Sequence, residues 1–343
     1  KDNKIMFKRK STRKFKAVAC FAAVLALCFT VFTGCGSKEA SQVVIYSNAD
    51  DEAVAAMTDT LNDNGYEGKF IFQSFGTSEL GGKLLAEGTD IEADIVTMSS
   101  YYMDSAQEQN SMFQDLDFDV DTIKEVPSYY APFLANQGAI LLNTEVMKEN
   151  NLPTPKSLKD LAKPVYKGFI SVVDIEGSST AWLMVQALVD AYGEKEAQKI
   201  LEDIYTNAGA HMEQSGSGPI KKVRAGEVAI GFGLRHQAVA DKEEGLPVDF
   251  VDPTEGNFTL TEGIGIIDKG DDTNKLAMEM VRCIIENGRS KLMEYYPVPL
   301  YNGEKADDNA VSKNSKEFKE PLTVELLEKH QALSEAAKEA LAK

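Results

Sequence analysis

The sequence has few of the residues from which metal and disulfide sites are built. Its 343 residues include 4 cysteines, 3 histidines and 1 tryptophan. The histidines, His211, His236 and His330, lie far apart, and none of them belongs to an H-E-x-x-H pattern. A zinc ion needs three or four ligands that meet in space, so this distribution gives no support to a zinc site. We expect neither a bound metal nor a cofactor.

Net positive charge is also missing. The chain has 36 Lys and Arg against 54 Asp and Glu, which gives a formal net charge of -18 at pH 7. An acidic surface repels phosphate backbones and anionic lipid headgroups, so nucleic acid is not an expected partner. With 43% hydrophobic and 26% charged residues, the composition is that of a globular protein, and the length allows two domains.

Long apolar runs are missing except near the N-terminus. Basic residues up to position 16 precede an uncharged apolar run over 17–32. The pattern is typical of a secretion signal, and the run is short for a membrane-spanning helix. We therefore expect a signal peptide over 1–34.

Residues 32–35 read Phe-Thr-Gly-Cys and resemble a bacterial lipobox, in which the cysteine after the cleavage site is lipidated. Cys35 would then anchor the chain through lipid alone, with 35–42 as a short polar tether. An ordinary signal peptide that contains a cysteine is the alternative. Cys20 and Cys28 lie in the removed run, so Cys283 would have no partner for an internal disulfide.

Strand and helix patterns alternate after the tether. In the first part, buried-strand patterns cover 42–46, 69–74 and 93–97, and helical patterns cover 50–62, 78–87 and 101–108. In the second part, strand patterns cover 168–173, 228–232 and 248–251, and helical patterns cover 179–192 and 194–207. This alternation predicts an α/β fold of mostly parallel sheets flanked by helices.

Two apolar extended segments, 138–143 and 260–267, are placed to cross between these parts. We therefore predict two lobes rather than one large sheet. Lobe 1 would comprise 41–134 and 260–343, and lobe 2 would comprise 135–259. The C-terminal part from about residue 273, which is helical in pattern, is expected to pack on lobe 1.

Small hydroxyl and amide residues gather where the predicted strands end and helices begin. These positions are Ser47, Asn48, Thr77, Ser78, Ser99, Ser100, Ser178, Ser179, Ser215 and Ser217, with Gly218 beside the last. Ligands of open α/β sheets bind at that edge, where the N–H groups of the first helical turn are unpaired donors. Taken together, the positions predict a cleft that accepts an anion. Taken singly, each is also an ordinary helix N-cap.

The sequence contains neither a complete phosphate-binding loop nor a nucleophile motif of the G-x-S-x-G type. Residues 76–83 approach a phosphate-binding loop, but Gly82 stands where its lysine should be. No G-x-S-x-G pattern occurs, because Ser215 takes the place of the first glycine before Ser217. We expect a binding protein and not an enzyme, with a secreted enzyme on the same scaffold as the minor alternative.

Several longer motifs follow one another in a set order. They are YSNADDEAV (46–54), SFGTSELGGKL (74–84), EADIVTMSS (92–100), DIEGSST (174–180), SGSGPIKKVRAGEVAIGF (215–232) and VDPTEGNFTLTEGIGII (251–267). This order resembles that of the extracellular solute-binding proteins of bacterial ABC importers. The branch it resembles most contains binders of ferric iron, 2-aminoethylphosphonate and other small anions.

The resemblance implies a two-lobed periplasmic-binding-protein-like fold whose ligand cleft lies at the hinge. Closure would bend the chain near 134–137 and 256–259. The protein would be a monomeric lipoprotein, secreted and anchored to the outer face of the cytoplasmic membrane, that hands its solute to ABC permease subunits. A structural lipoprotein or adhesin, which would show no ligand-dependent closure, is a further alternative.

The identity of the ligand depends on one departure from the family pattern. Ferric binders of this branch usually carry adjacent tyrosines shortly after the strand that here covers 228–232, whereas this sequence has Arg235 and His236. A guanidinium stays charged and cannot hold a cation. We therefore expect a small anion, phosphonate-like, phosphate-like or an organic acid, with Arg235 as its charge partner and His236 as a further donor. Ferric iron or another cation is the alternative.

An aminophosphonate would carry an ammonium group as well. Glu176 and Glu262 are the acidic residues that we expect to meet it. By contrast, Lys221, Lys222 and Arg224 follow the Ser217 turn and are expected to form a solvated helix face.

Overall fold

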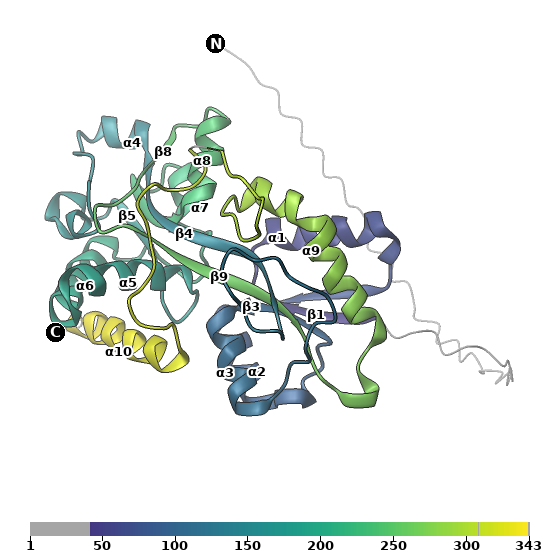
Figure 1. The fold of residues 1–343 in the computed structure, drawn as a ribbon. Helices are drawn as coiled ribbons and strands as arrows, with labels where there is room; N and C mark the ends of the chain where they lie inside the picture. The colour runs from purple at the N-terminus through teal and green to yellow at the C-terminus, as the bar shows by residue number, and fades with distance from the viewer. Residues whose placement is uncertain (1–41, 308, 342–343) are drawn as a thin grey trace, which may run out of the picture. The chain divides into compact units, whose positions relative to one another are not determined.

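The computed structural model describes residues 42–307 and 309–341, and Figure 1 shows the arrangement of its helices and strands. The expected signal peptide and Cys35 lie outside these residues. In the first part of the chain, β1 (Val43–Ser47) pairs in parallel with β2 (Phe70–Ser74) and β3 (Ile95–Ser99). Each strand leads into a helix, namely α1 (Asp51–Leu61), α2 (Thr77–Glu87) and α3 (Ser100–Asn110).

Two long antiparallel strands connect the two parts of the fold. They are β4 (Ala131–Asn143) and β9 (Asn257–Ile266), which run side by side through the centre of Figure 1. The β9 strand pairs with β3, and the register places Ser99 and Leu134 opposite Glu262. These are the crossing segments that the sequence predicts, and both are longer than expected.

The far end of β4 belongs to the second part of the fold. It pairs with β7 (Ile230–Leu234) and β8 (Val248–Val251), while β5 (Ile170–Val173) pairs in parallel with β7 and β6 (Met212–Glu213). The strand order is β2-β1-β3-β9-β4-β7-β5-β6, and β10 (Ser315–Lys316) is attached to β9. The predicted α/β class is confirmed.

Helices cover both parts of the sheet. The longer ones in the second part and at the C-terminal end are α4 (Thr144–Glu149), α5 (Thr180–Tyr192), α6 (Glu194–Ala208), α7 (Gly218–Arg224), α8 (Arg235–Glu243), α9 (Lys275–Tyr295) and α10 (Val324–Leu341). Short helical turns are η1 (Asn62–Tyr66), η2 (Gly88–Asp90), η3 (Lys159–Ala162), η4 (Pro164–Tyr166) and η5 (Gly270–Asp272). The α9 helix packs on α1 and β4, beside the first part of the sheet.

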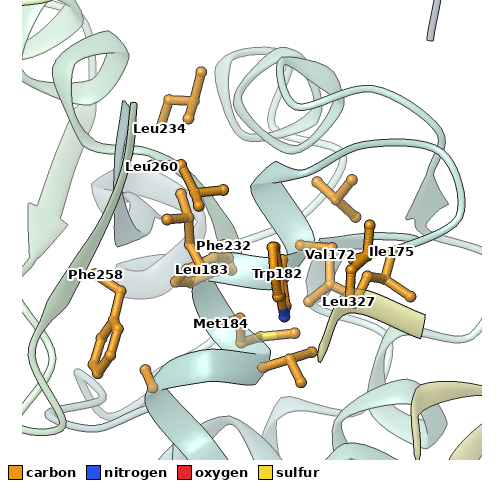
Figure 2. Packing of buried hydrophobic residues seen from close by; sticks show 14 of the residues in the cluster. Val172, Ile175, Trp182, Leu183, Met184, Phe232, Leu234, Phe258, Leu260 and Leu327 are labelled. Atoms are coloured by element: carbon orange, nitrogen blue, oxygen red, sulfur yellow. The ribbon is translucent and has the colours of Figure 1, made fainter. Parts of the chain in front are cut away.

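The core of the second part is built around α5. Trp182 and Leu183 are fully or almost fully buried, and Figure 2 shows them among side chains from β5, β7, β9 and α10. The nine residues from Thr180 to Leu188 are all buried, and all of them except Thr180 and Gln186 are apolar, as expected for a helix enclosed on every side. Burial of this kind is the main source of stability for this part of the fold.

The C-terminal helix differs from expectation. It packs mainly against α6 and α5 of the second part, with a smaller contact to α3 of the first part. The indole Nε1 of Trp182 donates to Nδ1 of His330 at 2.7 Å, and the hydroxyls of Tyr205 and Ser334 are 2.6 Å apart. The main contacts of α10 are therefore with the second part of the fold, whereas the sequence predicted packing on lobe 1. The boundaries of the two lobes stay a prediction.

Candidate functional site

A cavity of about 390 Å³ lies where strand ends from both parts of the fold meet. The first part contributes the turns after β1 and β2, and the second part contributes the turns after β5 and β6. A Cβ atom added to Gly76 would lie 3.6 Å from the carbonyl oxygen of Gly177, so the two walls approach to van der Waals contact. This is the edge at which ligands of α/β sheets bind.

Five of the predicted site residues line this cavity. They are Asn48, Thr77, Ser178, Ser215 and Ser217. The side chains of Ser215 and Ser217 form no hydrogen bond within the described residues, and Asn48 Nδ2 donates to Thr77 Oγ1 at 3.3 Å. Hydroxyls without a protein partner are free to bond a ligand.

Other predicted hydroxyls have structural roles. Ser47 Oγ accepts from Thr97 Oγ1 at 2.7 Å and from the Ala49 amide at 3.1 Å. Ser99 Oγ donates to Glu262 Oε1 at 2.8 Å. The remaining predicted positions, Ser78, Ser100, Ser179 and Gly218, are not among the residues that line this cavity.

The helices that start at the cavity are not capped by side chains. Within the described residues, neither Asp50, the N-cap of α1, nor Gly76, the N-cap of α2, makes a side-chain capping bond. The first N–H groups of these helices therefore keep their donors, and the positive end of each helix dipole faces the cavity. Such an end favours a bound anion.

Tight packing of two loops requires glycine on the opposite wall. A Cβ atom on Gly177 would come within 2.6 Å of the Gln214 carbonyl oxygen. The β5–α5 turn and the loop after β6 can therefore lie against each other only because Gly177 has no side chain.

Gln237 is a cavity residue that sequence reasoning missed. It is 5% exposed, lines the cavity, and its Oε1 atom has no hydrogen-bond partner among the described residues. The prediction selected Arg235 and His236, the first residues after β7. Because α8 begins at Arg235 and each residue turns the helix by about 100°, the third residue faces the other way from the first.

Arg235 does not face this cavity, contrary to the prediction. Its guanidinium forms a two-point pair with Asp252, at 2.8 and 3.2 Å, and Nη1 donates to the carbonyl oxygens of Asn309 and Ala310. The group also lies over the Phe250 ring, 4.5 Å from its centroid. These contacts occupy its donors, so Arg235 fastens α8 to β8 and to the 309–310 segment.

His236 and Glu176 are also placed elsewhere. The ring of His236 packs against Tyr296 at a centroid distance of 4.6 Å, and burial lowers its pKa to about 3, which leaves it neutral near pH 7. Glu176 is exposed, and Gln331 Nε2 donates to it at 3.4 Å. Neither residue can fill the role in the cavity that the sequence suggested.

Cationic side chains line the cavity after all. Lys221 and Arg224, expected on a solvated face, both belong to its wall, whereas Lys222 pairs with Glu227. Arg224 Nε is held by Asp241 Oδ2 at 2.6 Å. Lys221 is exposed and has no ion pair within the described residues, so its charge is available to a solute.

Acidic groups stand at the first-part wall. Asp50 lines the cavity, and its pKa is raised to about 6 by burial and by the neighbouring Glu52 and Asp51, with Lys221 acting in the opposite direction. Burial also raises the pKa of Glu262 to about 7. Hydrogen bonds from Ser99 and Asn48 lower this pKa, and the charge of Asp50 raises it. The cavity thus has acidic and basic sides.

The sequence of this chain matches a known protein family. Residues 90–318 match the family described as bacterial extracellular solute-binding protein. The chain is similar to the Fe(3+)-binding periplasmic protein of Serratia marcescens, with 29% identity over 221 residues that span 62% of this chain and 62% of that protein.

Two solved structures show the same fold. AfuA from Actinobacillus pleuropneumoniae, with exogenous fructose-6-phosphate bound, has a TM-score of 0.69 and 21% identity, covering 88% of this chain and 96% of that one. Iron-bound HitA from Pseudomonas aeruginosa has a TM-score of 0.67 and 18% identity, covering 87% of this chain and 99% of that one. The predicted two-lobed periplasmic-binding-protein-like fold is confirmed.

The family and its structural neighbours are binding proteins, and solute-binding proteins of this family deliver their ligands to ABC permease subunits. In the part of the chain that the structure describes, no helix is both long and apolar enough to cross a membrane. With a family match that extends over most of the fold, this chain belongs to the bacterial extracellular solute-binding proteins.

Proposed function

We propose that this protein captures a small anionic solute, such as a phosphonate, a phosphate ester or an organic acid, and carries it to an ABC permease. The observation that supports this most directly is the convergence of uncapped helix starts and unpaired hydroxyls on one cavity. The starts of α1 and α2 come from the first part of the fold, and Ser215 and Ser217 come from the second. A solute that bonds both walls is fully satisfied only when they are close together.

In this proposal the solute is bound mainly by hydrogen-bond donors and not by an arginine held in place to pair with it. N–H donors, Ser217 and the Gln237 amide supply hydrogen bonds, and Lys221 supplies a positive charge. Donors of this kind bind an anion locally, although the net charge of the protein is negative. We further propose that the protein acts as a monomer and is held at the membrane by a lipid on Cys35.

The alternative of ferric iron has support from the Serratia relative. Within the described residues, however, no group of three or more His, Cys, Asp and Glu side chains is placed to hold a metal ion. No tyrosine of the described chain is among the residues that line the cavity, and Tyr129, for example, donates its hydroxyl to Asp104 at 2.7 Å. The cavity geometry therefore favours the anion.

Thermal unfolding of the chain from Gly36 onward, with phosphate, phosphonates, sugar phosphates, carboxylates, polyamines, thiamine and ferric citrate, tests this function. A solute at 100 times its dissociation constant stabilises the fold by about 2.7 kcal/mol, which raises the midpoint by several degrees. We expect the shift with an anionic solute and its loss in Gln237→Ala. A shift with ferric citrate alone would overturn the proposal.

A further inference from the structure

A third stretch of chain lies beside the two crossing strands. Residues 309–316 come between α9 and α10, and their last two residues form β10, which pairs in parallel with β9 at 257–258. The α9 helix packs on α1 and β4, whereas α10 packs mainly on α6 and α5. The chain that leads to α10, yellow in Figure 1, therefore passes from the first part of the fold to the second beside β4 and β9.

A buried polar network joins this stretch to the second-part ends of both crossing strands. The side chain of Gln137 on β4 accepts from the Ser312 amide at 3.2 Å and donates to Ser315 Oγ at 2.8 Å. Ser312 Oγ donates to Asn257 Oδ1 of β9 at 2.6 Å. Asn257 Nδ2 in turn donates to the Gly138 carbonyl oxygen at 2.8 Å. Because these groups are buried, breaking one bond leaves an unpaired polar atom, so we expect the three segments to move as one body.

Arg235 ties the same network to α8. Its guanidinium donates to the carbonyl oxygens of Asn309 and Ala310 and pairs with Asp252. Asp252 Oδ1 also accepts from Asn257 Nδ2 at 2.8 Å, so the network and the ion pair share one carboxylate. Hydrogen bonds between charged groups are stronger than those between neutral groups. Arg235 therefore fixes this stretch of chain to the second part of the fold.

A separate set of bonds fixes the first-part end of β4. The Tyr301 hydroxyl donates to the Pro132 carbonyl oxygen at 2.7 Å. Arg289 Nη1 donates to the Phe133 carbonyl oxygen at 2.6 Å. The Arg289 guanidinium also pairs with Glu304 at two points, both at 2.8 Å, and the residue is 7% exposed. These groups come from α9 and the loop that follows it, so β4 is attached to the first part of the fold as far as Phe133.

Between these attachments lies a short stretch that has only its strand pairing. It comprises 134–136 of β4 and 260–261 of β9, which lie side by side, and the pairing is irregular just before it. Within the described residues, no side-chain hydrogen bond reaches these five positions, and the Asn136 Oδ1 atom is buried without a partner. Ala135 and Thr261 line a second cavity, of about 510 Å³, so there is space beside the strands. Few bonds and free space both reduce the free energy of local movement.

We propose that the bend between the two parts of the fold is confined to 134–136 and 260–261, and that the attached C-terminal stretch sets this position. The hinge predicted from the sequence was longer and included Gln137 and 256–259, but Gln137 and Asn257 belong to the network and move with the second part. A short hinge with one axis brings the two walls of the cavity together in the same way at every closure. This inference goes beyond solute capture and does not depend on which solute is bound.

The ring contact between Tyr101 and Trp182 reports on the bend. Tyr101 belongs to α3 in the first part and Trp182 to α5 in the second, and their ring centroids lie 4.9 Å apart. Trp182 is fully buried and is the single tryptophan of the sequence. Opening at the hinge separates the two rings and admits acrylamide, so quenching of the tryptophan fluorescence measures how often the two parts open.

Two alanine-to-glycine substitutions in β4 test the position of the hinge. Ala135→Gly lies in the proposed hinge, and Ala139→Gly, the matched control, lies in the same strand beyond the network; both alanines are buried. Without added solute, we expect Ala135→Gly to raise the acrylamide quenching constant about two- to fivefold, the factor that corresponds to the extra backbone freedom of glycine. Ala139→Gly should match the wild type. No increase in Ala135→Gly, or an equal increase in both variants, overturns the proposed hinge position.

Ser312→Ala tests whether the network holds β9. It removes the 2.6 Å bond to Asn257, and we expect the backbone amides of 257–259 to exchange hydrogen about 10-fold faster than in the wild type, as measured by mass spectrometry. Ser334→Ala is the matched control, because it removes a buried serine hydroxyl that lies 2.6 Å from the Tyr205 hydroxyl in the core of the second part. It should leave the exchange of 257–259 unchanged.

A second break in the network guards against a variant that does not fold. Gln137→Ala removes the bonds to Ser312 and Ser315 and should have the same effect on 257–259 as Ser312→Ala. Unfolding curves verify that every variant is folded. Unchanged exchange of 257–259 in both folded variants overturns the role of the C-terminal stretch. Neither measurement uses a solute, so these outcomes leave the proposed anion capture intact, and failure of anion capture leaves the hinge intact.

Discussion

At the scale of single residues, the unusual feature is a carboxyl group buried without a cationic partner. Glu262 is 3% exposed, and burial raises its pKa from the ordinary 4.5 to about 7. Its folded-state pKa therefore lies above its unfolded-state value. The folded state binds this proton more tightly, so the contribution of Glu262 to stability is fully present below pH 4.5 and is lost as the pH rises through 7.

Glu262→Gln should remove this loss. We expect the variant and the wild type to have similar pH dependence below pH 4.5 and the variant to gain an advantage between pH 4.5 and 7, on the order of 3 kcal/mol at pH 8. Urea unfolding across this pH range measures the effect. A constant difference between the two proteins at every pH would contradict the assigned pKa.

At the scale of elements, α10 closes the core beside the cleft. His330 on α10 is 1% exposed and accepts the indole N–H of Trp182. Burial lowers the pKa of His330 to about 4. This folded-state pKa lies below the unfolded value of about 6.5, so stability should fall as the pH drops from 6.5 through 4.

His330→Ala should destabilise the fold by about 2 to 4 kcal/mol, because it leaves a cavity and an unpaired indole N–H. It should also flatten the fall of stability between pH 6.5 and 4. Urea unfolding at several pH values checks both effects. Lys329→Ala is the control on the same helix, since its ion pair with Glu194 is exposed and should contribute little to stability.

At the scale of the whole molecule, the two walls of the cavity are close together. The narrow point is between Gly76, at the start of α2, and Gly177, after β5. Bringing these walls together is what we expect of a solute-loaded state, with bending in β4 and β9 near 134–136 and 260–261.

Gly76→Phe should hold the walls apart. We expect a weaker affinity for the solute and a larger radius of gyration in X-ray scattering with solute present, with little change in the unfolding midpoint. Gly82→Phe introduces the same side chain in α2 where nothing lies within 4 Å of an added Cβ, and should behave like the wild type in scattering. Identical scattering of both variants with solute would show that closure does not bring Gly76 and Gly177 together.

Local patterns determined much of the fold. The mainly apolar stretch from Trp182 to Leu188 and the alternation of strands and helices depend on neighbouring residues, so the α/β class and most elements were predictable from the sequence. The hydroxyls of Thr77, Ser178 and Ser217 were found because strand ends in such sheets share one edge.

Only the tertiary structure decided which charges serve the site. Arg235 pairs with Asp252, 17 residues away, and α8 turns Gln237 toward the cavity instead. Ser99 and Glu262 meet because β9 returns beside β3, a pairing of segments more than 150 residues apart. The direction of a side chain along a helix and the pairing of distant strands depend on packing, which no local pattern in the sequence contains.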